Sequence, residues 1–284
     1  MLTYGEAFYK LRQDLQVWYD PQESAAIAHE VLYHITNLSK IDRLMLKDQM
    51  LTALQQNDFD YMADELLQGK PLQYVTGTAY FMEQTFVVNE SVLIPRPETE
   101  ELVFWILNDY AEKPQPEILD IGTGSGCIAI SLQQRMPEAR VSACDISTNA
   151  LATAHLNATQ KELPVRFLEL DILDEQARDT LASYDVIVSN PPYIPRREAL
   201  EMHENVKAFE PDNALFVPDE DPLLFYRNIA AFGLKHLKPG AAVYCELHRD
   251  LSAETALLFE QMGYRYVEPR KDMHDNWRML KAML

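Results

Sequence analysis

Residues 184–193 read YDVIVSNPPY, an apolar run that ends in an asparagine and two prolines. The first six residues are rich in β-branched side chains, which favours a strand of a parallel sheet over a helix. Neither Pro191 nor Pro192 has an N–H group for a sheet, and a residue before proline avoids helical angles, so the strand should stop at Asn190. We therefore expect a stiff turn at the carboxyl end of this strand, where open α/β sheets bind their ligands.

This turn carries groups that suit the binding of a planar –NH₂ group. The side-chain carbonyl of Asn190 can accept one N–H, and the main-chain carbonyl of Pro191 can accept the other. The ring of Tyr193 can stack on a flat amide or base. The same residues also fit an ordinary strand stop with a polar residue, because turn residues commonly follow strands. Other parts of the sequence are needed to choose between the two interpretations.

From residue 116 onward the sequence alternates between short apolar strands and amphipathic helices. Such repeats with short links predict an α/β fold whose parallel sheet is doubly wound, with right-handed crossovers. Besides 184–189, the predicted strands are residues 117–121, 140–145, 165–170, 241–246, 264–268 and 278–283. The predicted helices are residues 127–135, 148–159, 223–237 and 251–262.

A glycine-rich loop, DIGTGSG at residues 120–126, follows the first of these strands. Its glycines allow a tight turn and let a ligand approach the backbone, although the spacing differs from the G-x-G-x-x-G of dinucleotide sites. Asp145 ends the next strand, where a carboxylate can accept hydrogen bonds from both hydroxyls of a ribose. Asp171 ends the third strand, where it can meet an adenine amine, with Ile172 beside it to cover the base. Together these residues predict a nucleoside pocket that includes Gly122, Thr123, Gly124, Ser125 and Gly126.

The N-terminal part has a different pattern, with apolar residues at helical spacing up to about residue 67. Breaks at residues 20–21 and 37–40 divide it into helices, and the last of these is expected to include Leu44, Leu46, Met50 and Leu54. We expect a helical domain at residues 1–74 and a β-hairpin linker at 75–95, with its turn at 82–84. Residues 96–284 then form the second domain. Residues 97–100 have the proline and acids of a helix start, but the role of Arg96 is left open.

Composition excludes some classes of function. The formal net charge of -19 and the lack of Lys and Arg runs argue against a strong, non-specific grip on nucleic acid. No apolar stretch is long enough to span a bilayer, and the N-terminus does not resemble a signal peptide. The three cysteines lie in apolar runs without a CxxC, and the histidines are dispersed. We therefore expect core thiols in a reducing cytoplasm, with no metal site and no membrane partner.

The glycine loop, Asp145, Asp171 and the Asn-Pro-Pro-Tyr turn together resemble the class I S-adenosylmethionine-dependent methyltransferases that act on planar amino groups. Residues 71–77, 92–100 (VLIPRPETE) and 210–215 are moreover similar to the glutamine N5-methyltransferases of peptide chain release factors, the PrmC/HemK family. This resemblance covers nearly the whole chain. The chain departs from the family pattern at residues 246–248 and 274–278, which leaves the roles of His248 and His274 open.

The resemblance implies a Rossmann-like domain that binds S-adenosyl-L-methionine through residues 122–126, Asp145, Ile172 and Asn190. It also implies that residues 190–193 hold the glutamine of a Gly-Gly-Gln motif in a release factor. Asn190, Pro191 and Tyr193 would act chiefly by positioning, since no strong base is apparent, and the N-terminal helices would dock the release factor. One alternative is a methyltransferase for adenine N6 or guanine N2 of nucleic acid, and another is a non-catalytic nucleoside-binding domain. The acidic charge disfavours the first, and the amide-binding turn disfavours the second.

Overall fold

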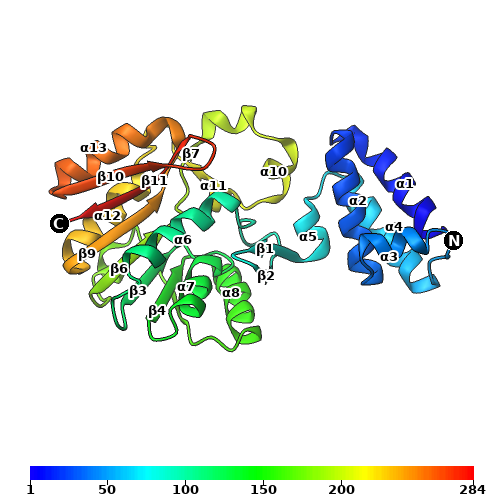
Figure 1. Ribbon diagram of the computed structural model, residues 1–284. Helices are drawn as coiled ribbons and strands as arrows, with labels where there is room; N and C mark the ends of the chain where they lie inside the picture. The colour runs from blue at the N-terminus through cyan, green and yellow to red at the C-terminus, as the bar shows by residue number, and fades with distance from the viewer. The chain divides into compact units, whose positions relative to one another are not determined.

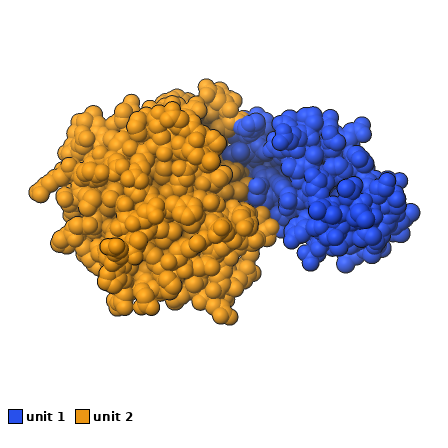
Figure 2. Space-filling view, in the orientation of Figure 1, with its two compact units in different colours: residues 1–77, 203–209 blue, residues 78–202, 210–284 orange.

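The computed structural model describes residues 1–284, which divide into two compact units. Unit 1 comprises residues 1–77 and 203–209, and unit 2 comprises residues 78–202 and 210–284 (Figure 2). The short segment 203–209 thus belongs to unit 1, although more than a hundred residues of unit 2 precede it in the sequence.

The named elements of unit 1 are all helices (Figure 1). Four of its helices begin at side chains that accept hydrogen bonds from N–H groups which the first helical turn leaves unpaired. Thr3, Ser39 and Thr52 each form a capping box, and the Asp20 carboxylate accepts from the N–H groups of the next turn. The helices are α1 (Tyr4–Asp14), a 3₁₀ turn (Leu15–Val17), α2 (Pro21–Thr36), α3 (Lys40–Met45), α4 (Ala53–Leu67), α5 (Leu72–Thr76) and α10 (Glu204–Phe209).

The predicted helix through Leu44, Leu46, Met50 and Leu54 is wrong. Helix α3 ends at Met45, and Met50 instead forms a bridge with Thr3. Because side chains of an extended segment alternate between two sides, Leu51 is buried there while Met50 is exposed. The apolar residues at 44, 46, 50 and 54 all lie on the surface of unit 1.

Unit 2 contains a seven-stranded sheet and two small two-stranded sheets. Its strands are β1 (Thr78–Phe81), β2 (Gln84–Val87), β3 (Glu117–Ile121), β4 (Arg140–Asp145), β5 (Arg166–Glu169), β6 (Tyr184–Ser189), β7 (Ile194–Pro195), β8 (Phe216–Val217), β9 (Leu237–Glu246), β10 (Tyr266–Lys271) and β11 (Trp277–Met283). Its helices are α6 (Pro97–Asp109), α7 (Cys127–Arg135), α8 (Thr148–Gln160), α9 (Glu175–Arg178), α11 (Asp212–Leu215), α12 (Leu224–His236) and α13 (Ser252–Met262), with 3₁₀ turns at Arg196–Glu201 and Arg249–Leu251.

The large sheet has the strand order β5-β4-β3-β6-β9-β11-β10. The first five strands run parallel, and β11 is antiparallel to both of its neighbours. Side chains alternate along β3, so Ile118 packs into one core with α6 and α7, while Leu119 packs into the other with α12 and α13 (Figure 1). The predicted doubly wound α/β fold is confirmed.

Several predicted elements have the bounds that the sequence indicated. Strands β3, β4 and β6 and helix α7 match residue for residue, whereas β5 ends at Glu169, two residues before Asp171. The predicted hairpin is β1–β2, and its two turn residues, Met82 and Glu83, have φ angles of 50° and 62°. Two positive φ angles give a turn whose twist matches that of the strands.

Two further expectations concern the burial of the cysteines and the presence of membrane-spanning segments. Cys127, Cys144 and Cys245 are free thiols and all three are buried, as predicted. None of the helices combines the length and the apolar composition that a membrane crossing requires.

Candidate functional site

A cavity of about 220 Å³ lies at the carboxyl ends of the parallel strands in unit 2. After β3 the chain builds β4 and β5 on one side and then crosses to β6 on the other, so the strand order reverses between β3 and β6. Ligands of open α/β sheets bind at such a reversal. The two strand ends are joined there, because the Ser189 hydroxyl donates to the main-chain oxygen of Ile121 at 2.7 Å. The glycine loop and the Asn-Pro-Pro turn both start at this junction.

The glycine loop leaves room on its cavity side. Gly122 and Gly124 have φ angles of 71° and 55°, and no atom lies within 4 Å of the position that a Cβ would take at either residue. Residues 122–125 line the cavity, whereas Gly126 does not. Gly126 instead directly precedes α7, and an added Cβ there would come within 3.2 Å of Ala154. Its role is therefore the close packing of α7 against α8.

Asp145 lines the cavity next to this loop. Its two oxygens accept the N–H groups of Gly124 and Ser147, each at 2.9 Å. Burial raises the pKa of Asp145, and the hydrogen bonds from the backbone oppose that rise. Each carboxylate oxygen can accept a second hydrogen bond, so the group can bind two hydroxyls without releasing the loop.

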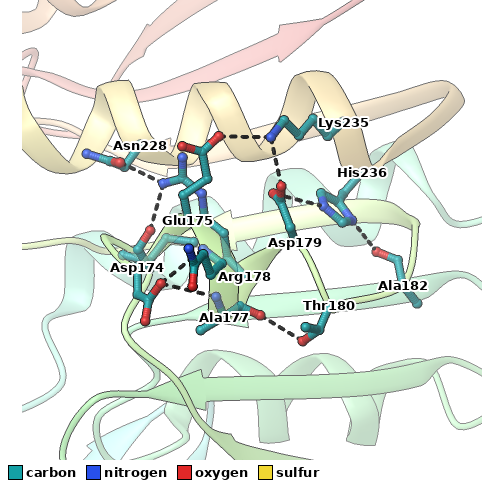
Figure 3. Close-up of polar contacts among 12 residues, drawn as sticks. Asp174, Glu175, Ala177, Arg178, Asp179, Thr180, Ala182, Asn228, Lys235 and His236 are labelled. Atoms are coloured by element: carbon teal, nitrogen blue, oxygen red, sulfur yellow. Dashed lines mark hydrogen bonds and ion pairs between the residues drawn. The ribbon is translucent and has the colours of Figure 1, made fainter.

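Asp171 and Ile172 lie on the next part of the cavity wall. The Asp171 carboxylate accepts the N–H of Leu173 at 2.8 Å, which shapes the turn after β5. Arg178, on α9, donates to the main-chain oxygen of Ile172 at 2.8 Å and to the Asn228 side chain at 2.6 Å. Figure 3 shows Arg178 and Asn228 together with Lys235 of α12. Lys235 forms ion pairs with Glu175 of α9 and with Asp179. Through Arg178, the part of the cavity wall that contains Ile172 is therefore held against α12.

One buried acid lies beneath the glycine loop. Asp120 accepts the Thr123 hydroxyl at 2.6 Å and the Ala129 N–H at 3.3 Å on the same oxygen. Its other carboxylate oxygen is buried without a hydrogen-bond partner in the protein. Burial raises the pKa of Asp120 to about 7. The loop is thus anchored to a group whose charge changes near neutral pH.

The Asn-Pro-Pro turn lines the opposite side of the cavity through Asn190, Pro191 and Pro192. Asn190 donates from Nδ2 to the Thr99 hydroxyl at 3.3 Å, and Thr99 donates to Glu246 at 2.5 Å. Tyr193 does not line this cavity. Its hydroxyl donates to Glu246 at 2.9 Å, and its ring packs edge-on against His248 with centroids 6.0 Å apart. The structure therefore gives His248 a packing role beside the turn.

Arg96, whose role the sequence left open, also lines the cavity. It forms a 2.5 Å ion pair with Glu210, whose side chain is 1% exposed. Glu210 also accepts the N–H of Ile94 at 3.4 Å. The pair holds the chain just before α6, and α6 carries Thr99 in its first turn.

Sequence reasoning missed Thr99 and Glu246 as members of this site. The proline and acids of residues 97–100 predict a helix start, and that prediction is confirmed by α6. Glu246 is an acid at the carboxyl end of an apolar strand, the same signal that identified Asp145. That signal was available, but the resemblance to the family placed no function there.

The residues at the cavity fit a nucleoside ligand. The glycine loop has space for close approach, Asp145 has acceptors for ribose hydroxyls, and Ile172 provides an apolar surface for a base. Asn190 lies within the same cavity, so a group bound at its side-chain carbonyl would lie beside such a ligand.

Comparisons with known proteins agree with this geometry. The family model for the methyltransferase small domain matches residues 104–208, and that for the PrmC N-terminal domain matches residues 10–77. A release factor glutamine methyltransferase from Flavobacterium psychrophilum is 40% identical, over 95% of this chain and 95% of its own length. One from Bacteroides thetaiotaomicron is 41% identical, over 96% of this chain and 97% of its own.

Solved structures of more distant proteins share the fold. The hMettl16 catalytic domain in complex with the MAT2A 3'UTR hairpin 6 has a TM-score of 0.56 and 16% identity, covering 80% of this chain and 82% of that one. A methyltransferase from Pyrococcus furiosus has a TM-score of 0.51 and 18% identity, covering 69% of this chain and 86% of that one. At these identities the likeness concerns the fold alone.

Proposed function

Because the chain belongs to the release factor glutamine methyltransferases, we propose that it methylates the side-chain amide nitrogen, N5, of the glutamine in the Gly-Gly-Gln motif of peptide chain release factors. The methyl donor is S-adenosyl-L-methionine. One structural observation supports this assignment above all: a single cavity is lined both by the nucleoside-binding residues and by the Asn190 turn. A methyl donor and an amide must be neighbours for transfer, and the residues proposed to bind each of them line the same cavity.

The residues of the cavity are suited to the donor. We propose that residues 122–125 approach its amino acid part, that Asp145 accepts its ribose hydroxyls, and that Asp171 and Ile172 contact its adenine. Bound there, S-adenosylmethionine supplies an electrophilic methyl group on a positively charged sulfur. Gly126 supports the loop through packing rather than contact, since it does not line the cavity.

On the substrate side the protein acts by orientation. A carboxamide nitrogen is a weak nucleophile, because its lone pair is shared with the carbonyl. We propose that the Asn190 side-chain oxygen and the Pro191 main-chain oxygen accept its two N–H groups and so aim the lone pair into the cavity. Holding reactants in line can lower a barrier by about 7–11 kcal/mol. Contact of the Tyr193 ring with the glutamine stays a prediction.

No side chain of the turn is suited to act as a strong base. Burial and the neighbouring Glu246 charge raise the pKa of Tyr193, so its phenol keeps its proton and donates it to Glu246. Glu246 itself is 2% exposed and is separated from Asn190 by the Thr99 hydroxyl. We propose that the amide proton leaves to solvent after the methyl group has begun to transfer.

Unit 1 has a surface suited to binding the protein substrate. Its residues 41–54 present several large apolar side chains to solvent, including Leu44, Met45 and Leu54 at 70%, 80% and 71% exposure. Apolar clusters of this kind commonly mark protein-binding sites. We propose that they dock the body of the release factor. Replacing Leu44 and Met45 by Ser should raise the KM for intact release factor but not for a short Gly-Gly-Gln peptide, whereas Leu257→Ser in unit 2 should change neither.

A cytoplasmic location is proposed with this function. Release factors act in translation, and three free, buried thiols suit a reducing compartment.

The direct test is mass spectrometry of a release factor after incubation with the protein and S-adenosylmethionine. We expect a gain of one methyl group on the glutamine of the Gly-Gly-Gln motif, and none on DNA or RNA assayed in parallel. Asn190→Ala should lower kcat by about 100-fold or more, since it removes a preorganised partner of the reacting group. Methylation of nucleic acid, with the release factor left unmodified, would contradict the assignment.

A further inference from the structure

Three side chains from distant parts of unit 2 form a hydrogen-bonded chain that ends at the cavity. Glu246 closes β9, Thr99 lies in the first turn of α6, and Asn190 follows β6. Thr99 donates from Oγ1 to Glu246 Oε2 at 2.5 Å, and Asn190 Nδ2 donates to Thr99 Oγ1 at 3.3 Å. Thr99 and Glu246 are each 2% exposed, so the hydrogen bond between them is shielded from water.

The direction of each hydrogen bond follows from which of the three side chains carry protons to donate. An ionised carboxylate can only accept, and a hydroxyl has one proton to donate. Since Thr99 gives its proton to Glu246, its oxygen can only accept from Asn190. The Asn190 side chain must therefore direct its NH₂ toward Thr99, and its carbonyl oxygen is left to face the cavity.

Other groups around Glu246 favour its ionised carboxylate, which accepts hydrogen bonds. The Tyr193 hydroxyl donates to its second oxygen, Oε1, at 2.9 Å. Burial raises the pKa of Glu246, and the hydrogen bonds from Thr99 and Tyr193 and the charge of Arg278 oppose that rise. Both carboxylate oxygens thus have a hydroxyl donor, and a positive charge lies nearby. Glu246 thus bonds Tyr193, the last residue of the turn, directly, and it is linked to Asn190, the first, through Thr99.

We propose that Glu246, acting through Thr99, fixes the orientation of the Asn190 amide and thereby makes the site select a carboxamide over a carboxylate. This inference rests on the proposed function. With its oxygen toward the cavity, Asn190 accepts an N–H from glutamine and repels the oxygens of glutamate. If the amide turned over, its NH₂ would face the cavity and would favour glutamate instead. Thr99 and Glu246 are positioning residues, since they act through Asn190.

The test compares two peptides that differ at one residue: one contains Gly-Gly-Gln, and the other contains Gly-Gly-Glu. Their dissociation constants are measured by fluorescence polarisation with S-adenosylhomocysteine present, so no turnover is required. Thr99→Val keeps the shape of the side chain but removes the hydroxyl, and Thr99→Ser is the matched variant that keeps it. Glu246→Gln is a second, nearly isosteric variant, whose NH₂ can donate to Thr99 and reverse the chain of bonds. S-adenosylhomocysteine affinity verifies that each variant is folded.

We expect Thr99→Val to reduce the preference for glutamine over glutamate by at least about tenfold, or about 1.4 kcal/mol, because Asn190 can then turn over. Thr99→Ser should keep most of the wild-type preference for glutamine, and Glu246→Gln should reduce that preference. A merely structural role would weaken both peptides equally. An unchanged preference in Thr99→Val and Glu246→Gln overturns the inference, provided that the wild-type protein methylates the release factor; an inactive wild-type protein would instead contradict the proposed function.

Discussion

Asp145 is the residue whose replacement tests the cofactor site most directly. Its carboxylate accepts the N–H groups of Gly124 and Ser147 at 2.9 Å each and has one further acceptor position on each oxygen. Asp145→Ala removes all of these acceptors. Asp145→Asn keeps the size of the side chain but turns one oxygen into an NH₂ group. That group faces a backbone N–H, and two donors cannot form a hydrogen bond with each other.

The expected loss follows from the number of hydrogen bonds. A hydrogen bond to a charged group contributes about 1.5–3 kcal/mol, so two ribose contacts amount to about 3–6 kcal/mol. Asp145 is partly exposed, which favours the lower end of this range. We therefore expect Asp145→Ala to raise the Kd for S-adenosylmethionine by about 100-fold, because each 1.4 kcal/mol is a factor of ten. Asp145→Asn should lose about half of that free energy.

The same carboxylate predicts a pH dependence. Burial raises the pKa of Asp145. The proposed hydrogen bonds from the ribose hydroxyls are strongest with its ionised form. Affinity for the cofactor should therefore be highest above that pKa and should fall as the pH is lowered through it. The affinity of Asp145→Asn should change little over the same range, because its amide does not titrate.

Isothermal titration calorimetry with S-adenosylmethionine measures both effects. Glu169→Gln is the matched control, because Glu169 pairs with Asp145 in the sheet register but is exposed and does not line the cavity. It should leave the Kd within about threefold of wild type. The reasoning is refuted if Asp145→Ala binds as tightly as the wild type, or if Glu169→Gln loses as much affinity as Asp145→Asn.

Three further predictions concern stability, measured by thermal or urea unfolding. Burial raises the pKa of Asp120 to about 7, so the folded protein keeps a proton that the unfolded chain releases near pH 4. Wild type should thus lose stability relative to Asp120→Asn as the pH rises from about 4 to 7; a difference that is independent of pH would contradict this. Arg96→Met leaves the buried Glu210 unpaired and should lower the free energy of unfolding by about 3 kcal/mol, whereas Arg196→Met, at an exposed ion pair, should change it by less than about 1 kcal/mol. Gly126→Ala, at a φ of 81° with its Cβ 2.8 Å from a side-chain atom of α7, should cost about 2 kcal/mol or more, and an unchanged midpoint would contradict the packing role.

Local patterns in the sequence predicted the strands of the large sheet in unit 2, the main helices that cover it and the residues at the ends of its strands. The run 184–189 forms β6 with the expected bounds, because β-branched residues and the following prolines act over a few residues. Asp145, residues 122–125 and Asn190 could be placed together in advance, since the carboxyl ends of parallel strands meet at one edge of the sheet.

Contacts between distant residues depended on the tertiary structure. Thr99 and Glu246 are 147 residues apart in the sequence, and Arg96 and Glu210 are 114 apart. No period or spacing links such pairs, and each residue also has a local interpretation, as part of a helix start, a loop or a strand end. The Leu44–Leu54 segment shows the same limit, because pairing of Met50 with Thr3 overrode its helical spacing.

The sequence therefore specified several of the groups that reach the cavity, among them Asp145 and Asn190, because strand propensity and turn residues are properties of short segments. It did not specify how those groups are oriented. That Asn190 directs its carbonyl oxygen into the cavity follows from a proton on Thr99 and a carboxylate on Glu246, which only the packing of α6 against β9 brings into contact.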